Sequence, residues 1–164
     1  MDFTVIQRFA ASTDDVLALY TDPAFFVSLA PSDRLATPEL VAHHRTGDSA
    51  SLQLRFRFIG QLPSAVLRFV EPAKLTWIED TTINVRAASS TSVLRPDNYP
   101  DLLKASASAV FAGTGPTSTR TITGRVSVPV PIFGRKVEGA IVEGLTDYLH
   151  AEADAAARRL STDG

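Results

Sequence analysis

One segment near the C-terminal end restricts the possible folds most, because it is the only one with a long helical pattern. Between Arg135 and Leu160 the apolar residues recur at the spacing of a helix that is buried on one side. The residues of this stripe are Val137, Ile141, Gly144, Leu145, Tyr148, Ala155 and Ala156. From about Leu35 to Val128 the apolar residues mostly alternate, which predicts strands. A sheet with one sizeable helix to cover its apolar face must curl around that helix. The sequence therefore predicts an α+β fold in which a curved antiparallel β-sheet wraps around a long C-terminal α-helix.

The N-terminal part of the chain predicts one strand and two short helices. Residues 3–10 alternate as in a strand, and Ser12 then offers an N-cap oxygen for the first helix. Asp15 occupies the capping-box position three residues later. The residue before a proline avoids the helical region, so Asp22 and Pro23 end this helix. Pro23 also suits the first position of a second short helix, which Asp22 would cap.

The central part predicts a β-hairpin followed by three more strands. Residues 46–49 read TGDS, which is good turn chemistry between two alternating segments. The expected strands cover 35–45, 51–60, 74–83, 102–112 and 118–128, and a short helical turn is expected at 62–70. One face of the second strand is entirely apolar, with Leu52, Leu54, Phe56 and Phe58. That face is expected to be buried.

The junction between the last strand and the long helix combines proline, which has the most restricted backbone conformation, with glycine, which has the least restricted one. Proline cannot donate a backbone hydrogen bond, so Pro129 and Pro131 end the strand near Val128 and hold an extended connection. Gly134 suits a turn or the N-cap. Gly144 lies in the apolar stripe at a cost of about 1 kcal/mol relative to alanine, which indicates that space is needed there. The sequence leaves open whether a packed neighbour or a ligand fills that space.

Composition favours a single domain that spans residues 1–164. The 164 residues are 45% hydrophobic and 21% charged, with a formal net charge of −2 and no cysteine. No run of Lys or Arg suits phosphate contacts, and no apolar window approaches the roughly 18 residues of a membrane span. Nucleic acid and integral membrane association are therefore not expected. An acid at position 2 and no apolar leader favour a cytoplasmic protein.

Motifs for nucleotide, metal or covalent chemistry are absent from the sequence. It contains no GxxxxGK[ST], no complete G-x-G-x-x-G, no H-E-x-x-H and no G-x-S-x-G. We therefore expect no cofactor and no metal.

The order of elements resembles that of the START/Bet v 1-like superfamily (helix-grip, SRPBCC), which also contains the polyketide cyclases. The stretches LPSAVLRFV, LTW and VSVPVPIFGRKVE resemble an actinobacterial branch known mainly as a domain of unknown function. The chain departs from that branch at 133–135, which read FGR where two adjacent glycines are expected. The resemblance implies a curved sheet that grips the last helix around an apolar cavity. It implies no particular reaction, because the superfamily contains carriers, receptors, cyclases and chaperone-associated domains.

The inward strand faces and the helix stripe predict the wall of such a cavity. Its expected members are Leu52, Leu54, Phe56, Phe58, Trp77, Val126, Val128, Ile141, Leu145 and Tyr148. The alternative for each is a filled core. Trp77 is the strongest candidate for a ligand contact, because its ring can form a wall while its N–H orients a polar group.

His43 and His44 are adjacent, and neighbouring strand residues point to opposite faces, so they cannot share one metal ion. A two-residue hairpin loop would pair His43 with Leu52 or Leu54 and turn it inward, whereas a loop with an odd number of residues would reverse this. An inward His43 would orient a ligand or act as a general acid or base. The alternative is a histidine at the rim or hydrogen-bonded in the core.

Glu152 lies near the centre of the apolar stripe, one turn after Tyr148. A buried carboxylate needs a partner or a raised pKa. Three readings remain open: an ion pair with an arginine such as Arg120, a position at an open end of the fold, or a polar cluster with Tyr148 and His43 suited to proton transfer.

Two functions from different classes follow, with a third alternative. The first is binding or carriage of an apolar small molecule, such as a lipid, polyketide or isoprenoid, between sheet and helix. The second is a cofactor-independent enzyme of the cyclase or dehydratase type that uses the same cavity. The third is a protein-interaction module whose interior is filled.

Overall fold

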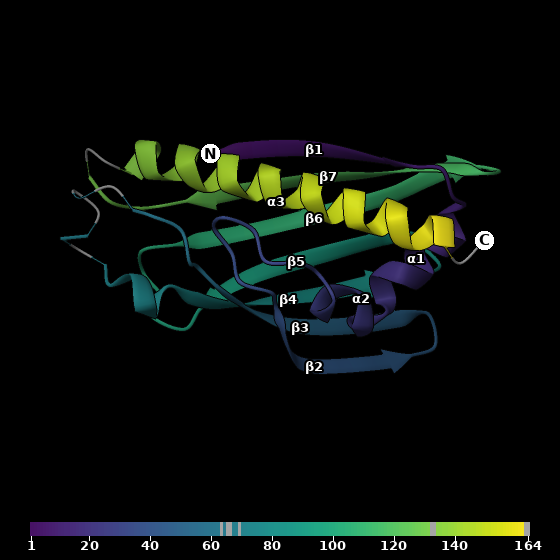
Figure 1. Cartoon of the computed structure of the whole chain (residues 1–164), viewed down its shortest axis with the longest axis horizontal. Helices are drawn as coiled ribbons and strands as arrows, with labels where there is room; N and C mark the ends of the chain where they lie inside the picture. The colour runs from purple at the N-terminus through teal and green to yellow at the C-terminus, as the bar shows by residue number, and fades with distance from the viewer. Residues whose placement is uncertain (63, 65–66, 69, 132–133, 163–164) are drawn as a thin grey trace.

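In a computed structural model of the chain, the described residues are 1–62, 64, 67–68, 70–131 and 134–162. Figure 1 shows a sheet with the long C-terminal helix lying across one of its faces. The elements in chain order are β1 (Asp2–Phe9), α1 (Thr13–Thr21), α2 (Pro23–Val27), β2 (Glu39–Thr46), β3 (Ser49–Arg57), the 3-10 helix η1 (Pro72–Lys74), β4 (Thr76–Asn84), β5 (Ser89–Pro96), β6 (Lys104–Thr114), β7 (Thr117–Ser127) and α3 (Gly134–Thr162).

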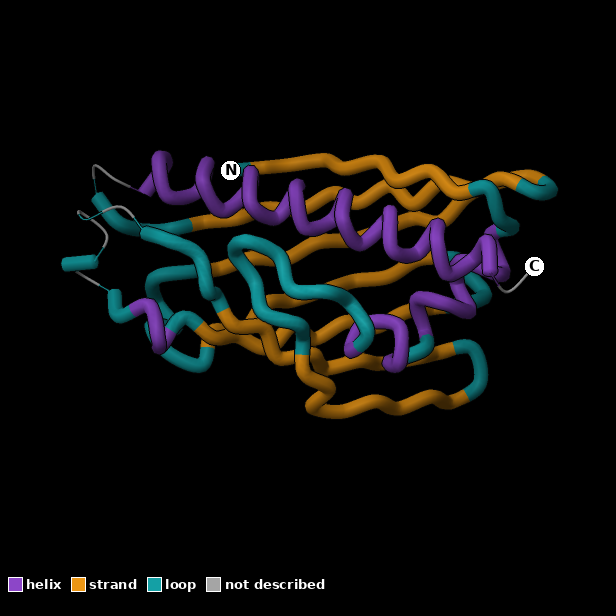
Figure 2. Tube along the Cα trace, viewed as in Figure 1, coloured by secondary structure: helices purple, strands orange, loops and turns teal. Residues whose placement is uncertain are grey.

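The sheet is antiparallel throughout, with the strand order β1-β7-β6-β5-β4-β3-β2. The first strand pairs with the last, so β1 and β2 form the two edges. Figure 2 shows α3 running along the sheet on the β1–β7 side, while α1 and α2 lie near its C-terminal end. This is the predicted fold class, a curved sheet around a C-terminal helix, and the prediction is confirmed.

The predicted caps at the start of the chain are present. The side chain of Ser12 accepts a hydrogen bond from the backbone N–H of Asp15 at 3.1 Å. The side chain of Asp22 accepts one from Ala24 at 2.9 Å and caps α2, with Pro23 at its first turn. These local signals set the residues at which α1 and α2 begin.

The junction before α3 also follows the sequence. β7 ends at Ser127, just before Pro129, and the N–H of Gly134 donates to the carbonyl of Val130 at 2.9 Å. At Gly144, a Cβ atom would lie 3.0 Å from Nη1 of Arg34. The space left open by this glycine is therefore filled by the Arg34 side chain, whose Nη1 donates to the carbonyl of Ala140 at 3.4 Å. A packed neighbour, not a ligand, explains Gly144.

Two parts of the structure differ from the sequence prediction. β5 was not predicted, because it is built mainly from Ser and Thr and does not carry an apolar alternation. β2 begins at Glu39, later than expected, although Leu35 still forms an isolated bridge to Phe58. The expected helical turn at 62–70 lies mostly outside the described residues.

Candidate functional site

A cavity of about 100 Å³ lies between the inner face of the sheet and α3. Side chains from every strand except β2 and from all three α-helices line it. Its volume is of the same order as the ~150 Å³ apolar cavity that holds one benzene molecule. The space is therefore on the scale of a single ring.

The sheet side of this cavity carries a row of polar side chains on β4 and β5. Thr81 pairs with Ser92 across the two strands, and their hydroxyl oxygens lie 2.7 Å apart. The hydroxyl of Thr81 also donates to Oε1 of Glu79 at 3.3 Å. Ser90 is buried and lines the same cavity. We call Glu79, Thr81, Ser90 and Ser92 the polar floor.

Glu79 is the ionisable member of the polar floor. Burial raises the pKa of its carboxyl group above the usual 4.5, and the negative charge of Glu152 raises it further. The positive charge of Arg120 and the hydroxyl hydrogen bonds act in the opposite direction. Among the described residues, no Lys, Arg or His side chain forms an ion pair with Glu79.

Glu152 has the partner that the sequence suggested. Its Oε1 accepts a hydrogen bond from Nη1 of Arg120 at 2.7 Å, and Glu152 is 5% exposed. The same Nη1 donates to Oε1 of Gln7 at 3.2 Å, and the guanidinium group lies 4.2 Å from the centre of the Tyr20 ring. Among the readings left open for Glu152, the ion pair with Arg120 is confirmed.

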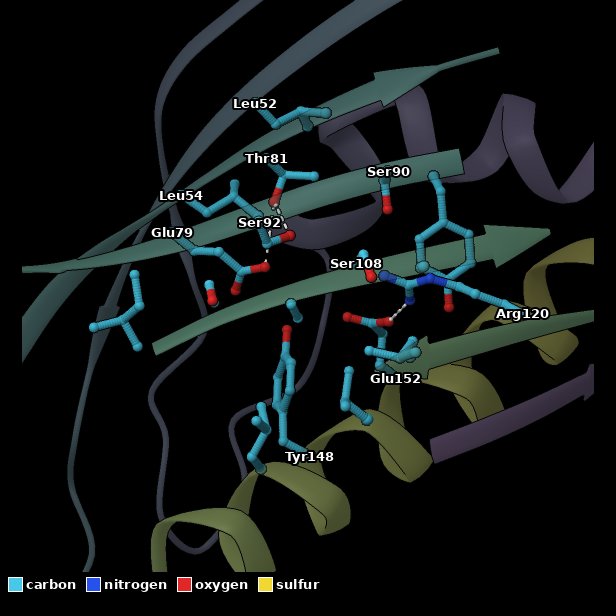
Figure 3. A pocket seen from close by; sticks show the side chains of 18 of the residues that line it. Leu52, Leu54, Glu79, Thr81, Ser90, Ser92, Ser108, Arg120, Tyr148 and Glu152 are labelled. Carbon is cyan, nitrogen blue, oxygen red and sulfur yellow. Dashed lines mark hydrogen bonds and ion pairs between the residues drawn. The ribbon is translucent and has the colours of Figure 1, made fainter. Parts of the chain in front are cut away.

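Tyr148 extends from α3 into the cavity, with its hydroxyl group pointing toward the polar floor (Figure 3). The hydroxyl oxygen is buried and has no hydrogen-bond partner among the described residues. Burial raises the pKa of Tyr148 well above 10.0, and the charges of Glu152 and Glu79 raise it further. The group is therefore a neutral phenol, with a free donor in a largely apolar space.

The structure places half of the predicted residues on the cavity wall. Those that line it are Leu52, Leu54, Phe56, Leu145, Tyr148 and Glu152. Those that do not are Phe58, Trp77, Val126, Val128, Ile141 and His43. Val126 and Val128 are buried in the sheet–helix core, and Ile141 is half-buried on α3. Trp77 stacks beside its cross-strand partner Phe56, with ring centres 5.8 Å apart, and does not line the cavity.

His43 has the predicted register but not the predicted surroundings. The hairpin has a two-residue loop, Gly47-Asp48, and His43 pairs with Leu52, as expected for an inward side chain. However, all eight residues of β2 are exposed, because this edge strand lies beyond the cover of α3. His43 therefore does not join Tyr148 and Glu152 at the cavity, and the expectation that it lines the wall is wrong.

Sequence reasoning missed the polar floor. Glu79 shares strand parity with Trp77, so an inward carboxylate was visible in the alternation of 74–83 once that strand was predicted. Ser90 and Ser92 gave no such signal, because small hydroxyl residues are common in loops and β5 was not recognised.

Neither a metal cluster nor a membrane-spanning helix accompanies this site. Within the described ranges, no group of three or more His, Asp or Glu side chains is arranged to hold a metal ion. No helix of the described chain is long and apolar enough to cross a membrane.

The antiparallel sheet, the C-terminal helix across it and the cavity between them are the features of the helix-grip fold. The chain belongs to the family described as "Protein of unknown function (DUF2505)", which matches residues 4–160. No curated protein matches the sequence.

Solved structures share the whole architecture at low sequence identity. The Zhui aromatase/cyclase from Streptomyces sp. R1128 has a TM-score of 0.68 and 14% identity, covering 98% of this chain and 95% of that one. Norcoclaurine synthase from Thalictrum flavum has a TM-score of 0.63 and 20% identity, covering 98% and 86%. The protein TTHA0849 from Thermus thermophilus has a TM-score of 0.66 and 14% identity, covering 100% and 99%. These likenesses show the fold.

Proposed function

We propose that the chain binds a hydrophobic small molecule in the cavity between the sheet and α3. Leu52, Leu54 and Phe56 form apolar walls from β3, and Leu145 faces them from α3. Lipids, polyketides and isoprenoids were the classes expected from sequence. A cavity of about 100 Å³ favours a body of one ring, and a larger ligand would have to extend beyond it.

One observation carries this proposal: the buried hydroxyl of Tyr148 points into the cavity without a partner. A buried polar group without a hydrogen bond is unfavourable by roughly 1–3 kcal/mol, so such groups are normally satisfied by protein, water or ligand. A mostly apolar cavity with one free donor is the usual design of a site that binds a small molecule and orients it.

Thermal unfolding in the presence of toluene and of p-cresol tests the proposal. We expect both probes to raise the melting temperature, because a ligand that binds only the folded state stabilises it. The variant Ala107→Leu adds bulk to the cavity wall and should abolish both shifts. Its control is Thr91→Leu, which adds the same side chain at an exposed position of β5 and should retain them. The absence of any shift in the unmodified protein would refute the proposal.

A second candidate function is a cofactor-independent cyclase or dehydratase, and the position of Glu79 favours it. A carboxyl group with a raised pKa, across the cavity from a neutral phenol, suits proton transfer to and from a carbonyl compound. In an intramolecular aldol condensation, one carbon–carbon bond forms and one water molecule leaves. The reaction of a short poly-β-ketone thioester, followed by the absorbance of an aromatic product, tests this candidate. Turnover should be lost in Glu79→Gln, and equal turnover in this variant would exclude the role.

Three broader predictions remain proposals: that residues 1–164 form one domain, that the protein is cytoplasmic, and that its source is actinobacterial. Heavy use of arginine, with lysine only at 74, 104 and 136, is in keeping with a GC-rich source.

A further inference from the structure

The two carboxylates of the cavity differ in their partners. Glu152 is neutralised by Arg120 at 2.7 Å. Glu79 receives hydrogen bonds only from neutral hydroxyl groups and has no ion-pair partner in the described part of the chain. If both carboxylates are ionised, the cavity contains one negative charge more than its positive charge. An ionised Glu79 would then be a half-buried charge with no cationic partner in the described part of the chain.

The surroundings of Glu79 do not compensate for this charge. The ionisable groups that face it are Glu152 and Tyr148 from α3 and Arg120 from β7, with Tyr20 of α1 beyond them. Glu152 raises the pKa of Glu79 more than Arg120 lowers it. At the position of Glu79, the net electrostatic effect of the Glu152–Arg120 pair is therefore negative. This effect favours a positive group at this end of the cavity, either a proton on Glu79 or a bound cation.

The hydrogen-bonding groups near Glu79 also suit a cation. An ammonium group has three N–H donors and no acceptor. Around the polar floor, the carboxylate of Glu79 and the hydroxyl oxygens of Ser90 and Ser92 offer acceptors. Tyr148 presents its hydroxyl oxygen to the same space from α3. A ligand with only carbonyl groups would leave the carboxylate unpaired.

We propose that the cavity selects a primary amine, as its ammonium ion, on a body of about one ring, and that Glu79 is the residue that determines this preference. This inference rests on the proposed binding function and narrows its ligand class. Glu79 is half-buried and is held by the hydroxyl group of Thr81, so part of its desolvation is already incurred on folding and a bound cation meets a carboxylate fixed in place.

Three probes with the same ring test the inference: benzylamine, its isostere benzyl alcohol, and toluene, with affinities measured by isothermal titration calorimetry near pH 7.5. The attraction between the ammonium group and the carboxylate of Glu79 predicts that benzylamine binds at least tenfold tighter than benzyl alcohol. In Glu79→Gln this preference should disappear, while toluene should bind as before. The control is Glu143→Gln, which changes an exposed carboxylate on α3 and should leave all three affinities unchanged.

The pH dependence gives a second measurement. Benzylamine affinity should rise with pH above about 4.5, because Glu79 loses its proton in that direction, and toluene affinity should stay constant. Equal binding of benzylamine and benzyl alcohol, or a preference that persists in Glu79→Gln, would overturn the inference while toluene binding still supported the proposed function. If none of the three probes binds, the proposed function fails and the inference falls with it. Circular dichroism of Glu79→Gln checks that the variant is folded.

Discussion

The inner face of the sheet has two regions that are built in opposite ways. Near the C-terminal end of α3, where α1 and α2 cover the sheet, aromatic rings fill the interior. The ring of Tyr20 lies 5.5 Å from that of Phe25, 6.0 Å from that of Phe26 and 5.9 Å from that of Phe111, all edge to face. Over β4 and β5, the cavity is lined by the hydroxyl side chains of Thr81, Ser90 and Ser92.

This difference shows how one sheet face can hold both a solid core and a cavity. Ser92 pairs with Thr81 on one side and with Ala107 on the other, so three short side chains lie in register across three strands. Short residues at adjacent positions leave a volume that nothing else fills. Arg120 stands at the border, with its guanidinium group over Tyr20 and its Nη1 on Glu152. Through Arg120, the aromatic rings of the filled region thus help to hold Glu152 in position at the cavity.

The largest effect that distinguishes the two regions is expected from Tyr20→Ala. Tyr20 is 1% exposed, and its removal should cost about 4–5 kcal/mol of unfolding free energy, because the surrounding rings cannot close the space. Leu145→Ala, which trims a half-buried residue beside existing empty space, should cost clearly less. Urea denaturation measures both values. Equal losses would contradict the distinction between a filled and a hollow region.

Most of the structure of the filled region could be predicted from the sequence. Alternation in β3, the caps at Ser12 and Asp22 and the stripe of α3 each specify local structure and burial together. The Arg120–Glu152 pair was among the expected alternatives because strand parity turns Arg120 inward and helical spacing turns Glu152 toward it. Where periodicity and burial agree, a pattern predicts the contact.

The second largest effect is expected from Arg120→Met. This change leaves Glu152 buried without its cation and should cost about 3–4 kcal/mol. The double variant Arg120→Met with Glu152→Leu should recover most of this loss, since no charge then remains in the apolar interior. Urea denaturation of the single and double variants gives the comparison. A double variant as unstable as the single one would show that Arg120 acts through packing on Tyr20 instead.

The hollow region was harder to predict, for two physical reasons. A cavity is made by what side chains fail to fill, and a Ser-rich strand such as β5 has the composition of a loop. His43 is a separate case: parity sets the face of the sheet on which a side chain lies, but whether anything covers that face depends on how far α3 and the loops extend. Whether helices and loops cover a sheet face depends on the tertiary structure, and the periodicity of one strand does not predict it.

A smaller effect, which depends on pH, is expected from Glu79→Gln. The folded-state pKa of Glu79 is raised above the usual 4.5, so its contribution to stability is present below about pH 4.5 and is lost as the pH rises through the folded-state value. Glutamine carries no such charge. The variant should therefore be more stable than the unmodified protein at pH 8, and the advantage should shrink toward pH 4. Unfolding free energies across this range provide the test, and a constant difference would mean that Glu79 does not titrate differently in the folded state.

The smallest effect on stability is expected from Tyr148→Phe. The Tyr148 hydroxyl has no partner in the described part of the chain, so its removal should change the unfolding free energy by less than about 0.5 kcal/mol, or should stabilise the protein slightly. Tyr20→Phe is the matched control: the Tyr20 hydroxyl donates to Gln7 at 3.3 Å, so the same deletion there should cost about 1 kcal/mol. Ligand binding should show the reverse order. The affinity for benzyl alcohol should fall in Tyr148→Phe and stay unchanged in Tyr20→Phe, because only the first hydroxyl is free to bond a molecule in the cavity. Calorimetric titration of both variants would refute this role for Tyr148 if benzyl alcohol bound them equally well.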